Sequence, residues 1–121
     1  MESIHDVGSG APADGDVLTA WIDIGAAETV GEAVPVSVEV DGVAVVVVRC
    51  GRELYAVEDR CTHDGESFTG AEVQSCELIC PRHGSHFSLR TGEALSPPAY
   101  EPLRTYAVRE QDGRILVEAE A

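Results

Sequence analysis

The sequence predicts an all-β fold: an antiparallel β-sandwich or small barrel with an inserted subdomain. Short extended segments follow one another along the chain, and turn-forming residues separate them. No stretch has the three-to-four-residue apolar spacing of a convincing amphipathic helix. Short strands at such spacing indicate an antiparallel sandwich or barrel. Two segments that contain Cys and His interrupt the strand pattern, and they predict the inserted subdomain.

An expected hairpin follows a first expected strand at Thr19–Ile24. Val34–Val40 alternates apolar with mixed positions, and Asp41-Gly42 then offers a two-residue turn into Val43–Cys50. Ala44–Val48 is the longest uninterrupted apolar segment of the chain. A continuous apolar run of this length predicts a buried strand.

Two more turn signals give the remaining strands. Gly51-Arg52 turns the chain into an expected strand at Glu53–Glu58. Near the C-terminus, Thr105–Arg109 and Arg114–Glu118 flank the Asp-Gly pair at 112–113, which predicts a second hairpin. The segments that contain Cys and His lie between these two groups of strands.

The length of 121 residues fits one domain. Residues 1–18 predict a flexible acidic N-terminal tail, and residues 19–121 the folded domain, with the inserted subdomain at about residues 60–98. The tail lacks the basic and apolar regions of a signal peptide, and no apolar stretch approaches the ~20 residues of a membrane span. We therefore expect a cytoplasmic protein without a membrane partner.

The composition is strongly acidic. The net charge is −14, from 22 acidic residues against eight arginines and no lysine. The phosphate backbone would repel such a protein, so nucleic acid is not an expected partner. The charge favours docking on basic protein surfaces, with faster encounter at low salt, and it also serves solubility.

The residues with distinctive chemistry form two mixed pairs, Cys61-Thr62-His63 and Cys80-Pro81-Arg82-His83. Each pair places one thiolate and one imidazole on a short loop, so the four side chains can close around a small metal centre. Two Cys and two His also suit tetrahedral zinc, but such zinc sites usually pair Cys with Cys and His with His. Mixed pairs suit a binuclear 2Fe–2S cluster with both thiolates on one iron and both imidazoles on the other.

At these residues the chain resembles the Rieske-type iron–sulfur family. The match covers Cys61–Gly65 and Cys80–Ser85, continues weakly through Phe87, Arg90–Gly92 and Pro97–Ala99, and spans most of the chain. The resemblance implies one 2Fe–2S cluster in a Rieske-like domain, with four ligands: Cys61, His63, Cys80 and His83. It also implies neighbours of the cluster in the ligand loops and in a proline-rich covering loop: Gly65, Gly84, Ser85, Pro97 and Pro98.

The resemblance further implies a soluble one-electron carrier, the ferredoxin component of an aromatic-ring oxygenase system. Its partners would be a flavin-dependent reductase and an oxygenase or another redox protein. Service to an iron–sulfur assembly system or a nitrite-reductase-like system stays open, because the sequence does not separate these carriers.

Two other classes of function are an enzyme and a structural or sensory module. An oxygenase would need a second domain with a mononuclear iron held by two His and a carboxylate. Only His5 and His86 remain for that role, and the chain has no room for the domain, so we do not expect an enzyme. A structural zinc module or a redox-sensing module is the remaining alternative, and metal analysis would separate it.

Departures from the family pattern predict a low reduction potential. Respiratory Rieske proteins carry a disulfide between the loops, at the positions of Glu66 and Arg82, and a tyrosine at the position of Phe87. Phe87 cannot donate a hydrogen bond to a cluster ligand, although Ser85 can donate to a bridging sulfide. Fewer donors, together with the nearby carboxylates of Asp64 and Glu66, favour roughly −150 to 0 mV, the lower part of the Rieske range.

The other two cysteines are predicted to be free thiols. Cys50 ends an apolar run and is expected to be a small buried residue, and Cys76 lies four residues before Cys80. A Cys50–Cys76 disulfide is the alternative. The expected reducing compartment argues against it.

Overall fold

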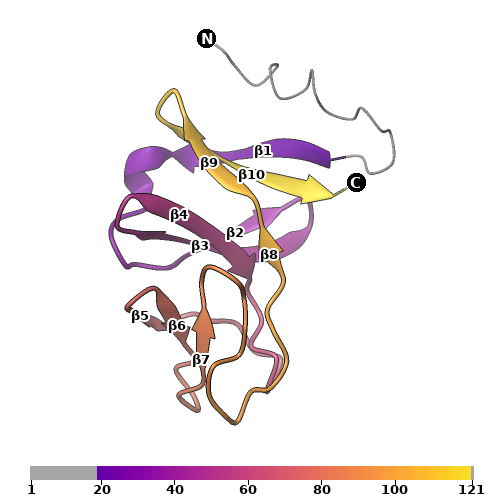
Figure 1. Cartoon of the computed structure of the whole chain (residues 1–121). Coiled ribbons are helices and arrows are strands. Elements are labelled where there is room, and N and C mark those ends of the chain that lie inside the picture. Colours follow the sequence, from indigo (N-terminus) through magenta and orange to yellow (C-terminus); the bar gives the residue numbers. More distant parts are fainter. Residues whose placement is uncertain (1–18, 121) are drawn as a thin grey trace.

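The computed structural model describes residues 19–120, which form three antiparallel sheets stacked one on another (Figure 1). The predicted tail lies outside the described residues. Within residues 19–120 the only helical element is a short 3-10 turn, η1, at Ala27–Thr29. The fold is therefore all-β, as the sequence predicted.

The first sheet has the strand order β1-β10-β9. Its strands are β1 Thr19–Ala26, β10 Arg114–Glu120 and β9 Val108–Gln111. The predicted hairpin turn at Asp112 and Gly113 is confirmed, and both residues have positive φ, at +54° and +77°. Two successive left-handed residues are typical of the tight turn that matches the twist of the flanking strands.

The second sheet is the middle layer of the molecule, with the order β2-β3-β4-β8 (Figure 1). Its strands are β2 Val36–Val40, β3 Val43–Cys50, β4 Glu53–Glu58 and β8 Thr105–Tyr106. The predicted turn at Asp41-Gly42 is again confirmed, with φ of +54° and +83°. We refer to the first and second sheets together as the base.

Burial on both faces explains the valine run of β3. Val45, Val46, Val47 and Val48 are all 0% exposed. Val45 and Val47 pack with residues of the first sheet, whereas Val46 and Val48 pack with the third sheet and its loops. A strand that is buried on one face alternates apolar and polar residues, but a strand between two apolar layers does not. The prediction of a buried strand here is confirmed.

The third sheet, with the order β5-β6-β7, belongs to the inserted region. Its strands are β5 Glu72–Gln74, β6 Glu77–Ile79 and β7 His86–Ser88. The chain leaves the middle sheet after β4 and returns at β8, and these two strands pair through Ala56↔Tyr106 and Val57↔Thr105. The region between them, which we call the cluster subdomain, therefore begins and ends at neighbouring points of one sheet.

One strand prediction needs correction. Thr105–Arg109 is not a single strand, because the chain breaks at Ala107 between β8 and β9. β8 pairs with β4 in the middle sheet, whereas β9 pairs with β10 in the first sheet. The segment passes from one sheet to the other. The alternation of apolar and polar residues along this segment gave no sign that its pairing strand changes from β4 to β10.

Candidate metal centre

Two loops of the cluster subdomain, residues 61–66 and 80–85, fold by the same hydrogen-bond pattern. In each loop the N–H of the leading Cys donates to the carbonyl five residues later, and the N–H of a Gly donates back to the Cys carbonyl. The two distances are 2.8 and 2.7 Å in the first ligand loop, and 2.9 and 2.9 Å in the second. The glycines, Gly65 and Gly84, have φ of +78° and +76°, a region that other residues adopt only with strain. The two predicted ligand pairs thus lie on equivalent turns.

Each ligand loop buries its cysteine. Cys61 and Cys80 are 0% and 1% exposed, and both are free thiols. Burial raises the pKa of the Cys61 thiol, as does the neighbouring Cys80, whereas hydrogen bonds from the backbone N–H groups of His63 and Asp64 lower it. A metal that displaced both thiol protons would make use of these donors, because they favour the thiolate form.

Each loop exposes its histidine. The rings of His63 and His83 meet edge to face, with centroids 4.8 Å apart and an interplanar angle of 86°. Both residues are exposed, and the side chain of His83 is 44% exposed. The structure therefore brings two exposed imidazoles together, and it brings the two buried sulfurs within 4.8 Å of each other. This donor set fits a binuclear centre with thiolates on one iron and imidazoles on the other.

Asp64 and Arg82 form a contact that the sequence analysis missed. Arg82 Nε donates to Asp64 Oδ2 at 2.7 Å, and a second guanidinium nitrogen donates to Oδ1 at 3.3 Å. The Arg82 guanidinium, together with a hydrogen bond from the N–H of Glu66, holds the pKa of the Asp64 carboxyl well below its usual range. One carboxylate oxygen also lies within 4.8 Å of the Cys61 and Cys80 sulfurs. The sequence did carry one signal for this contact: an acidic residue directly follows one predicted ligand histidine, and a basic residue directly precedes the other.

Residues 95–101 form a segment that bonds to both ligand loops, and we call it the covering segment. The N–H of Ala99 donates to Ser85 Oγ at 3.1 Å, in the second loop. Thr62 Oγ1, in the first loop, donates to the carbonyl of Glu101 at 2.7 Å. These two bonds hold the covering segment against both loops.

The predicted neighbours of the cluster lie in these same parts. Pro97 and Pro98 are in the middle of the covering segment and are joined by a cis peptide bond. Ser85 is 0% exposed, and its oxygen accepts the hydrogen bond from Ala99. Because Ser85 accepts in that bond, its hydroxyl proton is not used there. A hydrogen bond from Ser85 to a cluster sulfide would require that proton.

The prediction that Cys50 and Cys76 are free thiols is wrong, because they form a disulfide. Cys50 ends β3 in the middle sheet, and Cys76 lies in the turn between β5 and β6, so the bond ties the cluster subdomain to the base. Their Cα atoms are 5.8 Å apart, which is within the usual range for a disulfide. The prediction rested on the reducing compartment expected for the protein, whereas disulfide formation depends first on how close the two cysteines lie.

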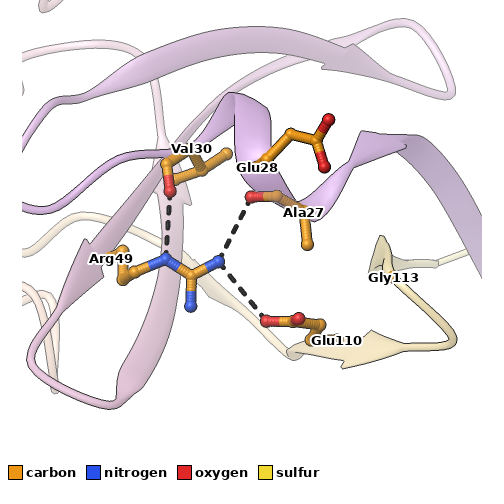
Figure 2. Close-up of a pocket in the computed structure, with 6 residues that line it drawn as sticks. All are labelled: Ala27, Glu28, Val30, Arg49, Glu110 and Gly113. Atoms are coloured by element: carbon orange, nitrogen blue, oxygen red, sulfur yellow. Dashed lines mark hydrogen bonds and ion pairs between the residues drawn. The ribbon is translucent and has the colours of Figure 1, made fainter.

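A cavity lies on the base, away from the two ligand loops (Figure 2). Arg49 Nε donates to the carbonyl of Val30 at 3.0 Å, and Nη2 contacts the carbonyl of Ala27 and the carboxylate of Glu110, each at 3.3 Å. The residues that line it include neither Cys nor His: Ala27, Glu28, Val30, Arg49, Glu110 and Gly113. Arg49 ties η1 to strands of both base sheets, so its contacts at this cavity serve the packing of the base.

The family model of the Rieske [2Fe-2S] domain matches residues 20–107, which include both ligand loops and the covering segment. This chain belongs to the Rieske [2Fe-2S] family. A Rieske domain carries a 2Fe–2S cluster, and the two equivalent loops suit it. Between residues 19 and 120 we find no helix with the length and apolar character needed to span a membrane.

Relatives of this Rieske chain are named as ferredoxins of dioxygenase systems. The chain is 29% identical, over 83% of its length and 96% of the relative, to the ferredoxin component of the naphthalene 1,2-dioxygenase/salicylate 5-hydroxylase systems of Ralstonia sp. It resembles the ferredoxin of carbazole 1,9a-dioxygenase from Nocardioides aromaticivorans IC177, with 31% identity, a TM-score of 0.77, and coverage of 81% of this chain and 96% of that one. A ferredoxin solved in complex with the oxygenase of carbazole 1,9a-dioxygenase gives 31% identity, a TM-score of 0.75, and coverage of 80% and 91%.

Proposed function

We propose that this protein is a one-electron carrier that passes electrons from a reductase to an oxygenase of a dioxygenase system. The observation that carries the proposal is the pair of equivalent ligand loops, each with a buried thiol and an exposed imidazole. Membership in the Rieske family supports it, as do the relatives named as ferredoxin components. The carrier is a component of an oxidoreductase system and is not itself the catalyst.

We assign one 2Fe–2S cluster to the chain, with Cys61 and Cys80 on one iron and His63 and His83 on the other. When bound, such a cluster takes up and releases one electron, at a potential above that of an all-thiolate cluster, because two neutral imidazoles replace two negative thiolates. The buried cysteines belong to the packed core of the cluster subdomain. The exposed histidines are the groups that a partner can approach, so we assign the exit of the electron to them.

The proposed acceptor is an oxygenase, in line with the similar ferredoxin solved in complex with one. The proposed donor is a flavin-dependent reductase, in the cytoplasm. The net charge of −14 suits partner surfaces that carry basic side chains. Asp64 is not a free docking charge, because its side chain is only 17% exposed and is bound to Arg82. Two exposed residues fit that role better: Glu66, at the end of the first ligand loop, and Glu101, in the covering segment.

Metal and sulfide analysis tests the assignment. The purified protein should contain two irons and two acid-labile sulfides per chain and show the visible absorption of an iron–sulfur cluster. Cys61→Ser and Cys80→Ser should each abolish that absorption, since each removes a thiolate ligand. The double variant Cys50→Ser/Cys76→Ser is the matched control and should keep it. Zinc without sulfide in the wild-type protein, or a full iron complement in Cys80→Ser, would overturn the proposal.

A further inference from the structure

The ion pair between Asp64 and Arg82 joins the two ligand loops directly. Asp64 follows the ligand histidine of the first loop, and Arg82 precedes the ligand histidine of the second. The guanidinium meets both carboxylate oxygens, at 2.7 and 3.3 Å. A contact of this two-point kind fixes orientation as well as distance. It therefore constrains how the backbone of one loop lies against the other.

The carboxylate is itself held in place. Asp64 Oδ1 accepts a hydrogen bond from the N–H of Glu66 at 2.9 Å, within the first ligand loop. Asp64 Oδ2 lies 3.5 Å from Nδ1 of His83, across in the second loop. The Asp64 side chain is 17% exposed and that of Arg82 is 32% exposed. An ordinary surface ion pair between mobile side chains contributes little, but here one partner is preorganised and mostly shielded.

The pair also places a fixed positive charge beside the sulfurs. Arg82 is the only arginine or lysine in the two ligand loops. It is bound at 2.7 Å to the Asp64 carboxylate, one oxygen of which lies within 4.8 Å of the Cys61 and Cys80 sulfurs. A cation close to these sulfurs favours added negative charge on the cluster, whereas the Asp64 carboxylate disfavours it.

We propose that Asp64 and Arg82 are a positioning pair for the cluster, which locks the two ligand loops together and sets opposing charges beside the metal centre. The inference rests on the proposed 2Fe–2S site. Loss of either partner should therefore loosen the cluster, whereas the two losses should move its reduction potential in opposite directions.

The test compares Arg82→Gln and Asp64→Asn in the full-length protein. Asn keeps an oxygen for the N–H of Glu66, so Asp64→Asn removes the charge without removing that bond. Two measurements are made on each variant: the midpoint potential by protein-film voltammetry, and the rate at which visible absorption is lost under an iron chelator. We expect Arg82→Gln to lower the potential and Asp64→Asn to raise it, and both to speed the loss of absorption severalfold.

Two further variants separate the locking role from the charge. Arg82→Lys keeps the charge but not the two-point contact, so its potential should stay near that of the wild type while the cluster is lost faster. Arg114→Gln is the matched control, because Arg114 also binds an aspartate, Asp23 on the base, with its Nε 3.2 and 3.1 Å from the two carboxylate oxygens. It should change neither measurement.

The outcomes distinguish this inference from the function on which it rests. Wild-type protein without iron and sulfide would overturn the proposed function. With the cluster present in the wild type, unchanged rates of cluster loss in both Arg82→Gln and Asp64→Asn would overturn the inference alone. So would potentials that shift in the same direction in these two variants.

Discussion

Strands of the base reach eight residues, whereas each strand of the cluster subdomain has three. The base is held by long backbone ladders and by a middle sheet whose strand β3 has a valine run that is buried on both faces. The cluster subdomain is held by tight turns, by side-chain hydrogen bonds, by one disulfide and by a small core. In that core the rings of Phe68 and Phe87 meet edge to face at 5.6 Å. The part that bears the predicted ligands therefore depends on few side chains, and the part that supports it depends on many backbone bonds.

The largest expected effect comes from breaking the small core. Phe87 is 0% exposed and packs in one apolar cluster with Cys61 and Cys80. Phe87→Ala should lower the free energy of unfolding by about 3–5 kcal/mol, because it removes the ring and leaves a cavity. We expect the visible absorption to be lost at a lower temperature than the β-sheet signal in circular dichroism.

The matched change in the base is Ile115→Ala. Ile115 is also 0% exposed, but it packs with residues of the first and middle sheets. It should cost about 2–5 kcal/mol, and absorption and β-sheet signal should then disappear together. Identical melting behaviour of the two variants would contradict the distinction between the two regions.

The next effect concerns the tie between the two regions, the Cys50–Cys76 disulfide. It closes a sequence separation of 26 residues, so Cys50→Ala should lower the free energy of unfolding by about 2–4 kcal/mol. Cys76→Gly also removes the bond, but glycine suits the φ of +60° at this position. This variant should therefore lower the free energy of unfolding by less than Cys50→Ala does. Chemical denaturation would measure both. The free thiols of the wild-type protein can also be counted after it is unfolded and its metal is removed, without a reductant. A count of four would show that the disulfide does not form.

The smallest expected effect is on docking. Glu66→Lys, at the end of the first ligand loop, should slow reduction by a reductase that reduces the wild-type protein, and Glu39→Lys on β2 should slow it less. Both residues are exposed, so the pair compares the same charge change in the two regions. Stopped-flow rates should fall from about 50 to 500 mM salt, since screening shortens the reach of charge from ~10 Å near 0.1 M to ~3 Å at 1 M. Equal effects of the two variants would mean that only the total charge matters.

Most of the base could be predicted from the sequence, because each of its signals is local. The Asp-Gly turns at 41–42 and 112–113 and the valine run of β3 needed no knowledge of distant neighbours. The strands of the cluster subdomain were not predicted. Three residues are too few to show an alternating pattern, and their positions depend on turns and side-chain bonds.

The ligand pairs could be predicted from the sequence for the same reason, since each pair lies within one short loop. Two contacts between distant residues were not predicted. The Asp64–Arg82 pair had only the weak signal of opposite charges at matching places, and the Cys50–Cys76 bond was considered only as an alternative, because the sequence does not show which distant residues lie close together. The ligand set itself, Cys61, His63, Cys80 and His83, stays a prediction that the metal analysis tests.

The cluster subdomain leaves and rejoins the base at strands that pair with each other, β4 and β8. Its two ends are therefore side by side, so the length and composition of what lies between them can change while the register of the base is kept. This geometry makes the ligand-bearing part a candidate for grafting: a β4–β8 pair on another sheet could receive residues 59–104 as one piece. The recipient would also need a cysteine at the place of Cys50, because the donor segment brings Cys76 with it.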